Sequence, residues 1–225
     1  MLLSFADLHF GVRSYSNQLS SGFFSAEEDA MIVLDKIFER ASQSDIDRVI
    51  VPGDITHTNK PTSLVVKFLT NWLYRIDELG KPFDFVPGNH DDSVYAHSIA
   101  FISELKLKNV NMIDRALLHN PARLSTAEIP SVRWNDWEIV FAPYFTVSSN
   151  SLKDKNEAAY SLVRDCLTFA QKKTIVVAHV QESSAKLGSE QVMISKGVDI
   201  INTDNYAKED IILLTGHIHR HQIYK

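Results

Sequence analysis

Short apolar runs alternate with longer helical patterns along most of the chain. The apolar runs predict buried strands, since each is brief and ends at a glycine or a polar cluster. These runs cover residues 2–6, 48–54, 83–88, 174–179 and 211–217. Apolar residues at three- and four-residue spacing predict helices at 25–44, 60–80, 93–107 and about 153–171. Strands that alternate with helices predict an α/β fold, in which helices cover a parallel sheet.

Local signals refine these boundaries. Ser25 and Glu28 have the spacing of a capping box at the start of the first helix. Pro61 lies near the start of the second helix and Gly80 at its end. Residues 122–144 are strand-like, with a predicted tight turn at Asn135-Asp136. The polar stretch 181–209 is interpreted as a long loop. With no repeat or linker in the sequence, we expect residues 1–225 to form one domain.

The helix 60–80 has an unusually wide apolar face. Its apolar residues spread over about 200° of arc, whereas a helix packed on one side of a sheet needs only about 100°. They are Leu64, Val65, Val66, Phe68, Leu69, Trp72, Leu73 and Ile76. The excess predicts a second buried contact. That contact could be another molecule or the neighbouring helix 93–106, itself rich in apolar residues.

Bulk properties exclude few functions. The 225-residue chain has a formal charge of −5, which argues against non-specific electrostatic binding to nucleic acid. That objection weakens if acidic residues bind metal, because two divalent cations would nearly cancel the charge. No apolar run approaches the roughly 20 residues that span a bilayer, so no membrane association is expected. The N-terminal MLLSF is too short for a signal peptide. A single cysteine, Cys166, excludes an internal disulfide framework and favours the cytoplasm.

Candidate metal ligands gather where the predicted strands end. Open α/β sheets collect their binding sites at the carboxyl ends of strands. The residues in these places are Asp7, His9, Asp54, Asn89, His90, Asp91, His179, His217 and His219. In an extended segment residues i and i+2 point to the same side, so Asp7 with His9, and His217 with His219, are expected to face one pocket. Imidazole, carboxylate and amide ligands suit manganese, iron or zinc, and Asp54 is the natural bridge between two cations.

These residues form an ordered pattern: D-x-H, G-D, G-N-H-[DE], a lone H and G-H-x-H. The pattern resembles that of the calcineurin-like metallophosphoesterases, from Asp7 to His219. The resemblance implies a four-layer α/β/β/α sandwich with mixed sheets and a dinuclear metal site. Asp7, His9, Asp54 and His219 would hold one cation, and Asp54, Asn89, His179 and His217 the other. His90 would protonate the leaving oxygen, and Asp91 would orient His90. An unperturbed imidazole, with a pKa of about 6.5, suits such proton donation.

Three stretches, DLHFG, GDITHTNKP and LLTGHIHRHQ, are similar to SbcD, the nuclease subunit of the bacterial and phage SbcCD complex. This subunit is the counterpart of the double-strand-break repair nuclease of meiotic recombination. The G-D-x-x-D-R-G and G-N-H-E motifs of serine/threonine phosphatases are not matched here. The resemblance implies a manganese-dependent DNA nuclease of recombination, repair or replication, with magnesium, iron or zinc as alternative metals. It implies exonuclease action on duplex ends, endonuclease action on single strands or hairpins, and an SbcC-type ATPase partner. Since relatives dimerise near the helix 61–80, a homodimer is also expected.

Other polar residues near the motifs leave two interpretations open. His57, Arg13, Lys60 and Arg220 could contact substrate or be ordinary solvated residues. His97 and His119 are expected on the surface, and His221 is not expected to bind metal. Relatives continue beyond G-H-x-H with a capping domain and ATPase-binding helices, so the chain is expected to be a truncated nuclease domain, intracellular and from a bacterium or phage. A small-substrate phosphodiesterase or nucleotidase is the alternative enzyme. A non-catalytic binding scaffold is the alternative class.

Overall fold

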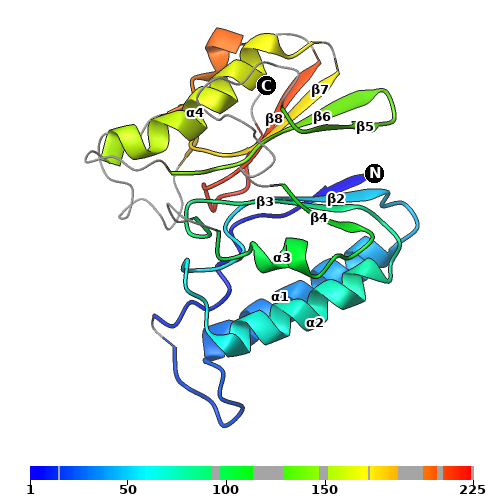
Figure 1. Cartoon of the computed structure of the whole chain (residues 1–225), viewed down its shortest axis with the longest axis vertical. Coiled ribbons are helices and arrows are strands. Elements are labelled where there is room, and N and C mark those ends of the chain that lie inside the picture. The colour runs from blue at the N-terminus through cyan, green and yellow to red at the C-terminus, as the bar shows by residue number, and fades with distance from the viewer. Residues whose placement is uncertain are drawn as a thin grey trace.

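The computed structural model stacks a helical layer, two sheets and a further helix into four layers (Figure 1). It describes residues 1–14, 16–92, 97–113, 129–146, 152–171, 173–186, 200–206 and 210–223. The predicted α/β/β/α sandwich is therefore confirmed. Residue 119 and residues 122–128 of the predicted strand region lie outside the described part.

The first sheet is built from β1 (Leu2–Ser4), β2 (Arg48–Pro52), β3 (Phe83–Val86) and β4 (Val110–Met112), in that order. All its neighbouring strands are parallel. β4 was not predicted, because three residues with an exposed asparagine in the middle carry little apolar signal.

The second sheet is built from β5 (Ser131–Trp134), β6 (Trp137–Ala142), β7 (Thr174–His179) and β8 (Ile211–Gly216). β5 and β6 are antiparallel, and the other neighbouring pairs are parallel. Asn135, with φ of 54°, lies in the predicted turn between β5 and β6. The expected mixed arrangement thus holds for this sheet but not for the first.

The helices match the predicted periodicity best where they are long. They are α1 (Ser25–Ser42), α2 (Ser63–Asp77), α3 (Phe101–Glu104) and α4 (Leu152–Phe169), with a 3₁₀ turn at Thr203–Tyr206 inside the predicted 181–209 loop. The predicted helix 93–107 is reduced to the short α3 among described residues. The capping box is displaced by one residue: Glu27, not Glu28, accepts the Phe24 backbone N–H at 2.8 Å. Glu28 instead accepts the Ser21 hydroxyl at 2.8 Å.

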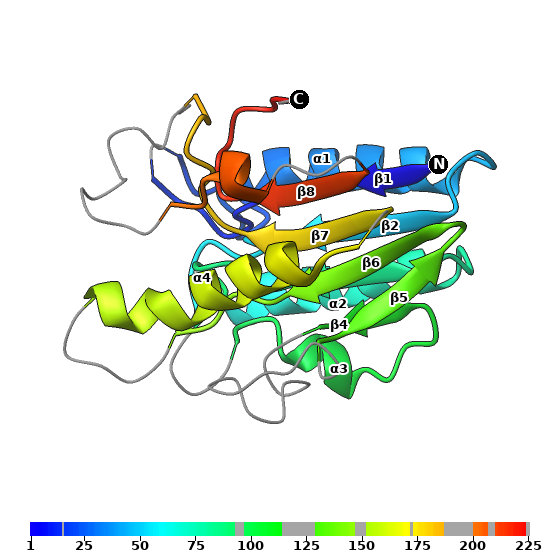
Figure 2. The same cartoon turned by 90° about the horizontal axis from the view of Figure 1, so that it is seen from above.

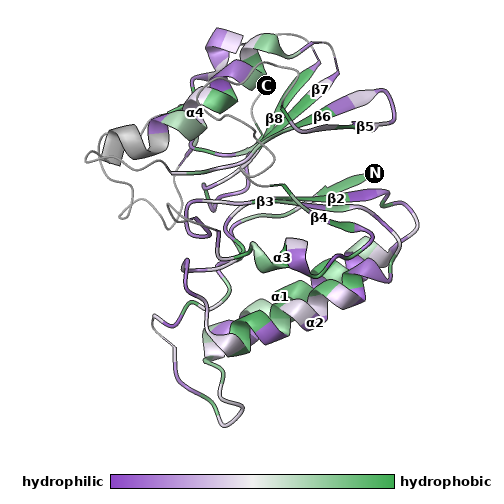
Figure 3. Cartoon of the chain, viewed as in Figure 1, coloured by the Kyte–Doolittle hydropathy of each residue, from purple (hydrophilic) through white to green (hydrophobic). Residues whose placement is uncertain are grey.

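Among the residues that the structure describes, three apolar clusters hold the layers together. One lies between the first sheet and α1–α3, and one packs α4 on the second sheet. The third joins the two sheets through Ile50 and Val86 on one side and Phe141 and Val177 on the other. Figure 3 shows the strands as mostly apolar, as expected for sheets that are covered on both faces.

The wide apolar face of α2 is used largely within the chain. Val65, Leu69, Trp72, Leu73 and Ile76 are buried in the cluster with the sheet and the other helices. Trp72 also donates its indole N–H to the Leu34 carbonyl of α1, at 3.2 Å. These contacts explain the wide arc without a second molecule, so the homodimer stays a prediction.

His97 is buried rather than on the surface, which corrects the sequence-based expectation. Its Nδ1 lies 3.0 Å from Asp92 Oδ1, and the two side chains are 2% and 0% exposed. Asp92 also accepts the Thr146 backbone N–H at 2.6 Å. Asp92 therefore joins the segment after β3 to the segment after β6.

Cys166 is buried and free, and burial raises the pKa of its thiol to about 12. None of the helices in the described residues has the length and apolar character needed to cross a membrane.

Candidate metal centre

The candidate ligands lie at the carboxyl ends of parallel strands of both sheets. Asp7 and His9 follow β1, Asp54 follows β2, and Asn89 follows β3. His179 ends β7, and His217 and His219 follow β8. Figure 2 shows β7 and β8 ending at the same side of the molecule, where the connecting loops gather. The two sheets therefore bring five distant segments to one place.

Sharp backbone turns, rather than extended strands, aim these side chains. Asp7, His9, Asp54 and His217 have φ angles of 56°, 48°, 54° and 87°, all in the left-handed region. The expectation that i and i+2 residues share the face of an extended segment is therefore wrong here, since β1 ends at Ser4 and β8 at Gly216. Such conformations cost about 1–3 kcal/mol each and persist only where surrounding contacts enforce them.

Those contacts come from the paired loops after β1 and β2. Asp7 donates its backbone N–H to the Gly53 carbonyl at 3.1 Å, and His9 donates to the Asp54 carbonyl at 3.0 Å. His217 from the second sheet donates its backbone N–H to both carboxylate oxygens of Asp7, at 2.9 and 3.1 Å. The strained turns are thus held by hydrogen bonds within and between the two halves.

One group of donor atoms surrounds His179. Its Nδ1 donates to the Pro52 carbonyl at 2.9 Å, which turns Nε2 toward the site. Nε2 lies 3.0 Å from Asn89 Oδ1 and 3.3 Å from Asp54 Oδ2. His217 Nδ1 is also 3.0 Å from Asn89 Oδ1. The geometry brings Asp54, Asn89, His179 and His217 together.

A second group surrounds His9. Its Nε2 lies 3.0 Å from His219 Nε2 and 3.7 Å from Asp54 Oδ2. Asp7, His9 and His219 offer ligand atoms that all lie within 4.8 Å of one another, and so do Asp7, Asp54 and His179. Asp54 therefore lies between the two groups, as expected for a bridge, and Asp7 also reaches both.

The donor set fits two divalent cations. Buried Asp54 and half-buried Asp7 supply negative charge, and the imidazole and amide donors face the same space. Lone pairs that converge at 3.0–3.7 Å repel one another unless a proton or a cation lies between them. A mixed nitrogen and oxygen set without thiolate suits manganese, iron or zinc.

The electrostatics of the metal-free chain show which groups are ready to bind. Burial lowers the pKa of His9 to about 3 and that of His217 to about 4, so both are neutral at neutral pH. Burial also raises the pKa of Asp7, and the neighbouring Asp54 carboxylate adds to the rise.

His179 and Asp54 form a coupled pair. Burial alone would lower the pKa of His179, but the Asp54 carboxylate outweighs it and raises the pKa to about 9. Burial alone would raise the pKa of Asp54, but His179 and His9 reverse that effect and hold it below its ordinary value. The proton on His179 therefore occupies the position that a cation would take.

His90 borders this cluster and is held by a backbone group. Its Nδ1 donates to the His57 carbonyl at 2.8 Å, which leaves Nε2 as the free nitrogen. Its backbone N–H donates to Asp54 Oδ1 at 2.9 Å. His57 itself lies beside it, with the two rings stacked at a centroid distance of 5.4 Å.

Asp91 does not make the orienting contact to the His90 ring that the resemblance implied. Its carboxylate accepts the backbone N–H groups of Ile55, Thr56 and Gly88, at 3.2, 2.8 and 3.0 Å. Burial raises the pKa of Asp91 to about 6, which leaves it ionised at neutral pH. Asp91 thus shapes the site by fixing the backbone just after Asp54 and just before Asn89.

Gly88 and Gly53 allow the close approach of these segments. A Cβ atom at Gly88 would lie 2.1 Å from Asp54 Oδ1, and one at Gly53 would lie 2.3 Å from His179 Nδ1. Any side chain at these positions would displace a candidate ligand.

The basic residues named from the sequence lie outside the cluster of donor atoms. Lys60, Arg220 and His221 are exposed, and His119 lies outside the described residues. Arg13 Nε donates to the fully buried Glu27 at 3.3 Å, and the guanidinium stacks on Phe24. Arg13 is therefore partly committed to holding its own loop.

Sequence reasoning missed the backbone groups that aim the imidazoles. The Pro52 and His57 carbonyls fix the rings of His179 and His90, respectively. No side-chain pattern could have identified them, because every residue carries a carbonyl.

This fold and cluster of donor atoms agree with the family match. The calcineurin-like phosphoesterase model matches residues 2–221, so the chain belongs to this family of metal-dependent hydrolytic enzymes. Among curated relatives, the DNA double-strand break repair protein Mre11 of Archaeoglobus fulgidus is 28% identical over 225 residues, which is 98% of this chain and 46% of that protein. The protein of the same name from Saccharolobus solfataricus is 27% identical over 90 residues, covering 40% of this chain and 22% of its own.

The chain thus spans about half the length, or less, of these curated relatives. Among solved structures, a dimetal phosphatase from Danio rerio aligns with a TM-score of 0.41 and 11% identity, covering 95% of this chain and 68% of its own.

Proposed function

We propose that this chain is the catalytic domain of a DNA nuclease that hydrolyses phosphodiester bonds at a dinuclear metal site. The observation that carries the proposal is the convergence of Asp54 with imidazoles from both sheets, His9 on one side and His179 on the other. The likeness to two double-strand break repair proteins supports DNA as the substrate. The proposed reactions are exonuclease cleavage of duplex ends and endonuclease cleavage of single strands or hairpins.

The donor groups suggest how two cations would be held. Asp7, His9, Asp54 and His219 would bind one, and Asp54, Asn89, His179 and His217 the other. Manganese is the proposed metal, because the set combines hard oxygen donors with imidazole. When bound, the cations supply Lewis acidity toward the phosphate and the attacking water.

His90 is proposed as the general acid. Since the His57 carbonyl holds Nδ1, a protonated His90 presents its Nε2–H to the leaving oxygen. The Asp54 contact to its backbone keeps this imidazole beside the metal cluster. Asp91 is proposed as a positioning residue that fixes the loops carrying Asp54 and His90.

Phosphate contacts outside the cluster would position the DNA. Exposed Lys60 and Arg220 and the half-buried His57 are the proposed contacts. Contacts of this kind provide affinity without sequence preference, which suits an enzyme that processes ends. Arg13 is a weaker candidate, given its contact with Glu27.

An SbcC-type ATPase partner, a homodimer near α2 and a cytoplasmic site of action in a bacterium or phage complete the proposal. All three rest on the similarity to SbcD. The runner-up is a phosphodiesterase or nucleotidase for small substrates, which the same site would serve. A non-catalytic scaffold is disfavoured, because every ligand position of the pattern carries a suitable donor.

The test offers manganese-loaded protein hairpin DNA and bis-p-nitrophenyl phosphate in parallel. Cleavage of the hairpin, lost in His90→Ala, would support the nuclease. Cleavage of the small ester alone would favour the runner-up. Full metal occupancy with no turnover of either substrate would favour the scaffold. The exposed His221 provides a matched control through His221→Ala, which should cleave like the unmodified chain.

A further inference from the structure

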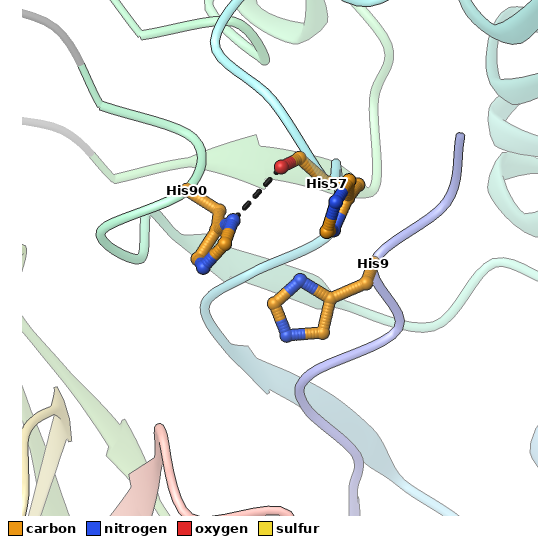
Figure 4. A group of neighbouring side chains, drawn as sticks. All are labelled: His9, His57 and His90. Atoms are coloured by element: carbon orange, nitrogen blue, oxygen red, sulfur yellow. Dashed lines mark hydrogen bonds between the residues drawn. The ribbon is translucent and has the colours of Figure 1, made fainter. Parts of the chain in front are cut away.

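Three imidazoles meet beside the metal cluster, and only one of them, His9, is a candidate ligand of the dinuclear site. His9, His57 and His90 come from the segments after β1, β2 and β3. One ring nitrogen of each lies within 4.8 Å of the other two. The ring centroids are 4.6 Å apart for His9 and His90, and 5.6 Å apart for His9 and His57. Figure 4 shows the three rings facing a common space.

Each ring can direct a nitrogen to this space. His90 keeps Nε2 free, since its Nδ1 donates to the His57 carbonyl at 2.8 Å. His9 directs Nε2 toward Asp54 and His219, whereas its Nδ1 is buried and has no hydrogen-bond partner among the described residues. The Nδ1 of His57 is likewise buried and unpartnered within the described part of the chain.

Buried polar atoms without partners are uncommon in folded proteins. Each costs about 1–3 kcal/mol when it lacks a hydrogen bond. Two such nitrogens on neighbouring rings therefore point to a ligand that contacts both. A cation meets this requirement, because each imidazole can bind it through a ring nitrogen that carries no proton.

We propose that His9, His57 and His90 form a third cation site, selective for zinc-like ions, whose occupation inhibits the enzyme. Three imidazoles without a carboxylate favour zinc, cobalt or copper over manganese and magnesium. His9 bridges this site and the dinuclear cluster through its two ring nitrogens. Its remaining ring proton is released to solvent when the third ion binds.

Inhibition follows from the proposed role of His90 as the general acid. The Nε2 lone pair that binds the cation is the position that must carry the proton for the leaving oxygen. A zinc-like ion at this site therefore removes the proposed general acid without displacing either catalytic cation. The inhibitory effect rests on the proposed function, whereas the site itself rests on the geometry of the three rings.

The first test counts ions. The full chain and the variants His57→Asn and His221→Asn are dialysed against zinc, and bound metal is measured by elemental analysis. We expect three ions in the unmodified chain and in His221→Asn, and two in His57→Asn. Two ions in the unmodified chain, or three in His57→Asn, would overturn the site. Because the His57 carbonyl is backbone, every variant keeps its contact to His90.

A second variant tests directly whether the side chain at position 57 coordinates the ion. His57→Cys keeps a metal-binding side chain, so it should retain three ions when cobalt replaces zinc. Its cobalt spectrum should gain a thiolate charge-transfer band that the unmodified chain lacks. A cobalt spectrum without that band, in a variant whose circular dichroism matches the unmodified chain, would contradict the assignment.

The third test measures inhibition. Hydrolysis of bis-p-nitrophenyl phosphate by the manganese-loaded chain should fall about 100-fold at saturating zinc, the scale of a lost general acid. His57→Asn should lose this sensitivity when compared with its own zinc-free rate. Equal sensitivity in both proteins would refute inhibition at this site. If neither protein hydrolyses the ester, inhibition is measured on hairpin DNA instead. Failure to cleave the hairpin as well would refute the proposed function, and the ion count would still decide the site.

Discussion

His9 and His219, 210 positions apart in the sequence, direct their Nε2 atoms at each other across 3.0 Å. A hydrogen bond between two imidazoles requires a proton on one of them. A divalent cation can instead accept both lone pairs at once. This contact joins the segment after β1 to the segment after β8, and it marks one end of the candidate metal cluster.

Replacing His219 should weaken one cation without disturbing the fold. His219 is exposed, so His219→Ala removes a ligand but little packing. We expect the affinity for one of the two ions to fall by at least about 10- to 100-fold. Replacing a residue that only hydrogen-bonds to a metal ligand already has an effect of this size. Titration of the metal-free protein measures this loss. His221→Ala, two positions further along and also exposed, should bind both ions normally.

Removal of the proposed general acid should separate turnover from metal binding. His90→Ala should slow hydrolysis by about 100- to 10,000-fold, the typical contribution of proton transfer. Both ions of the dinuclear site should remain, because His90 is not one of their proposed ligands. Metal content and initial rates are measured on the same preparation. An unchanged rate, or the loss of an ion, would contradict the assigned role.

A single methyl group at Gly88 should displace the bridging carboxylate. Its Cβ would lie 2.1 Å from Asp54 Oδ1, so Gly88→Ala must move Asp54 or the loop. We expect metal affinity and activity to drop together. Gly80→Ala is the matched control, since its Cβ meets nothing within 4 Å. With φ of 67°, that control should cost about 1 kcal/mol of stability and leave metal binding intact. Equal metal binding by the two variants would contradict the steric argument.

Metal binding should release a proton from His179. The Asp54 carboxylate raises the pKa of His179 to about 9, so a cation must displace that proton at pH 7.5. Affinity should therefore rise with pH up to about 9. His9 and His217, with pKa values of about 3 and 4, should add no slope in this range. Calorimetry in buffers of different ionisation enthalpy counts the released protons, and a count of zero would be incompatible with the His179–Asp54 pair.

The raised pKa of His179 also determines whether the stability of the metal-free protein rises or falls with pH. The pKa of His179 in the folded protein lies above the reference value of 6.5, so protonation of His179 contributes fully to the stability of the fold below pH 6.5. The contribution is lost as the pH rises through about 9. Thermal unfolding of chelator-treated protein should therefore show a decreasing melting temperature between these limits, and His179→Ala should lack this decrease.

Asp91→Asn should weaken both the fold and the metal site. The amide replaces a carboxylate oxygen that accepts backbone N–H groups with an NH₂ group that repels them. We expect a loss of about 1–3 kcal/mol in the free energy of unfolding. Urea unfolding measures this change, and metal titration should show weaker binding. Asp29→Asn, on the exposed face of α1, removes the same charge and should change neither quantity.

The structure brings together the candidate ligands named from the sequence, which could be named because metal chemistry restricts both residue type and order. Carboxylate and imidazole residues after successive strands could be recognised without coordinates. The long helices and the buried strands were also predictable, since their apolar periodicity follows directly from burial.

Features that depend on tertiary contacts were not predictable. The left-handed turns at Asp7 and His9 arise from pairing with the loop after β2, so an extended geometry was the wrong expectation. His97 was expected at the surface, because the chain gives no local sign that Asp92 would be buried beside it. The roles of Asp91 and of the His57 carbonyl depend on partners more than 30 positions away.

The ligands are divided between the sheets, with Asp54 on one side and His179 on the other. Bound cations would therefore cross-link two layers that are otherwise joined mainly by an apolar seam between Ile50 and Val177 and their neighbours. Shortage of the metal should then do more than stop turnover. It should loosen the halves from each other, expose that seam and shorten the lifetime of the protein against cellular proteases.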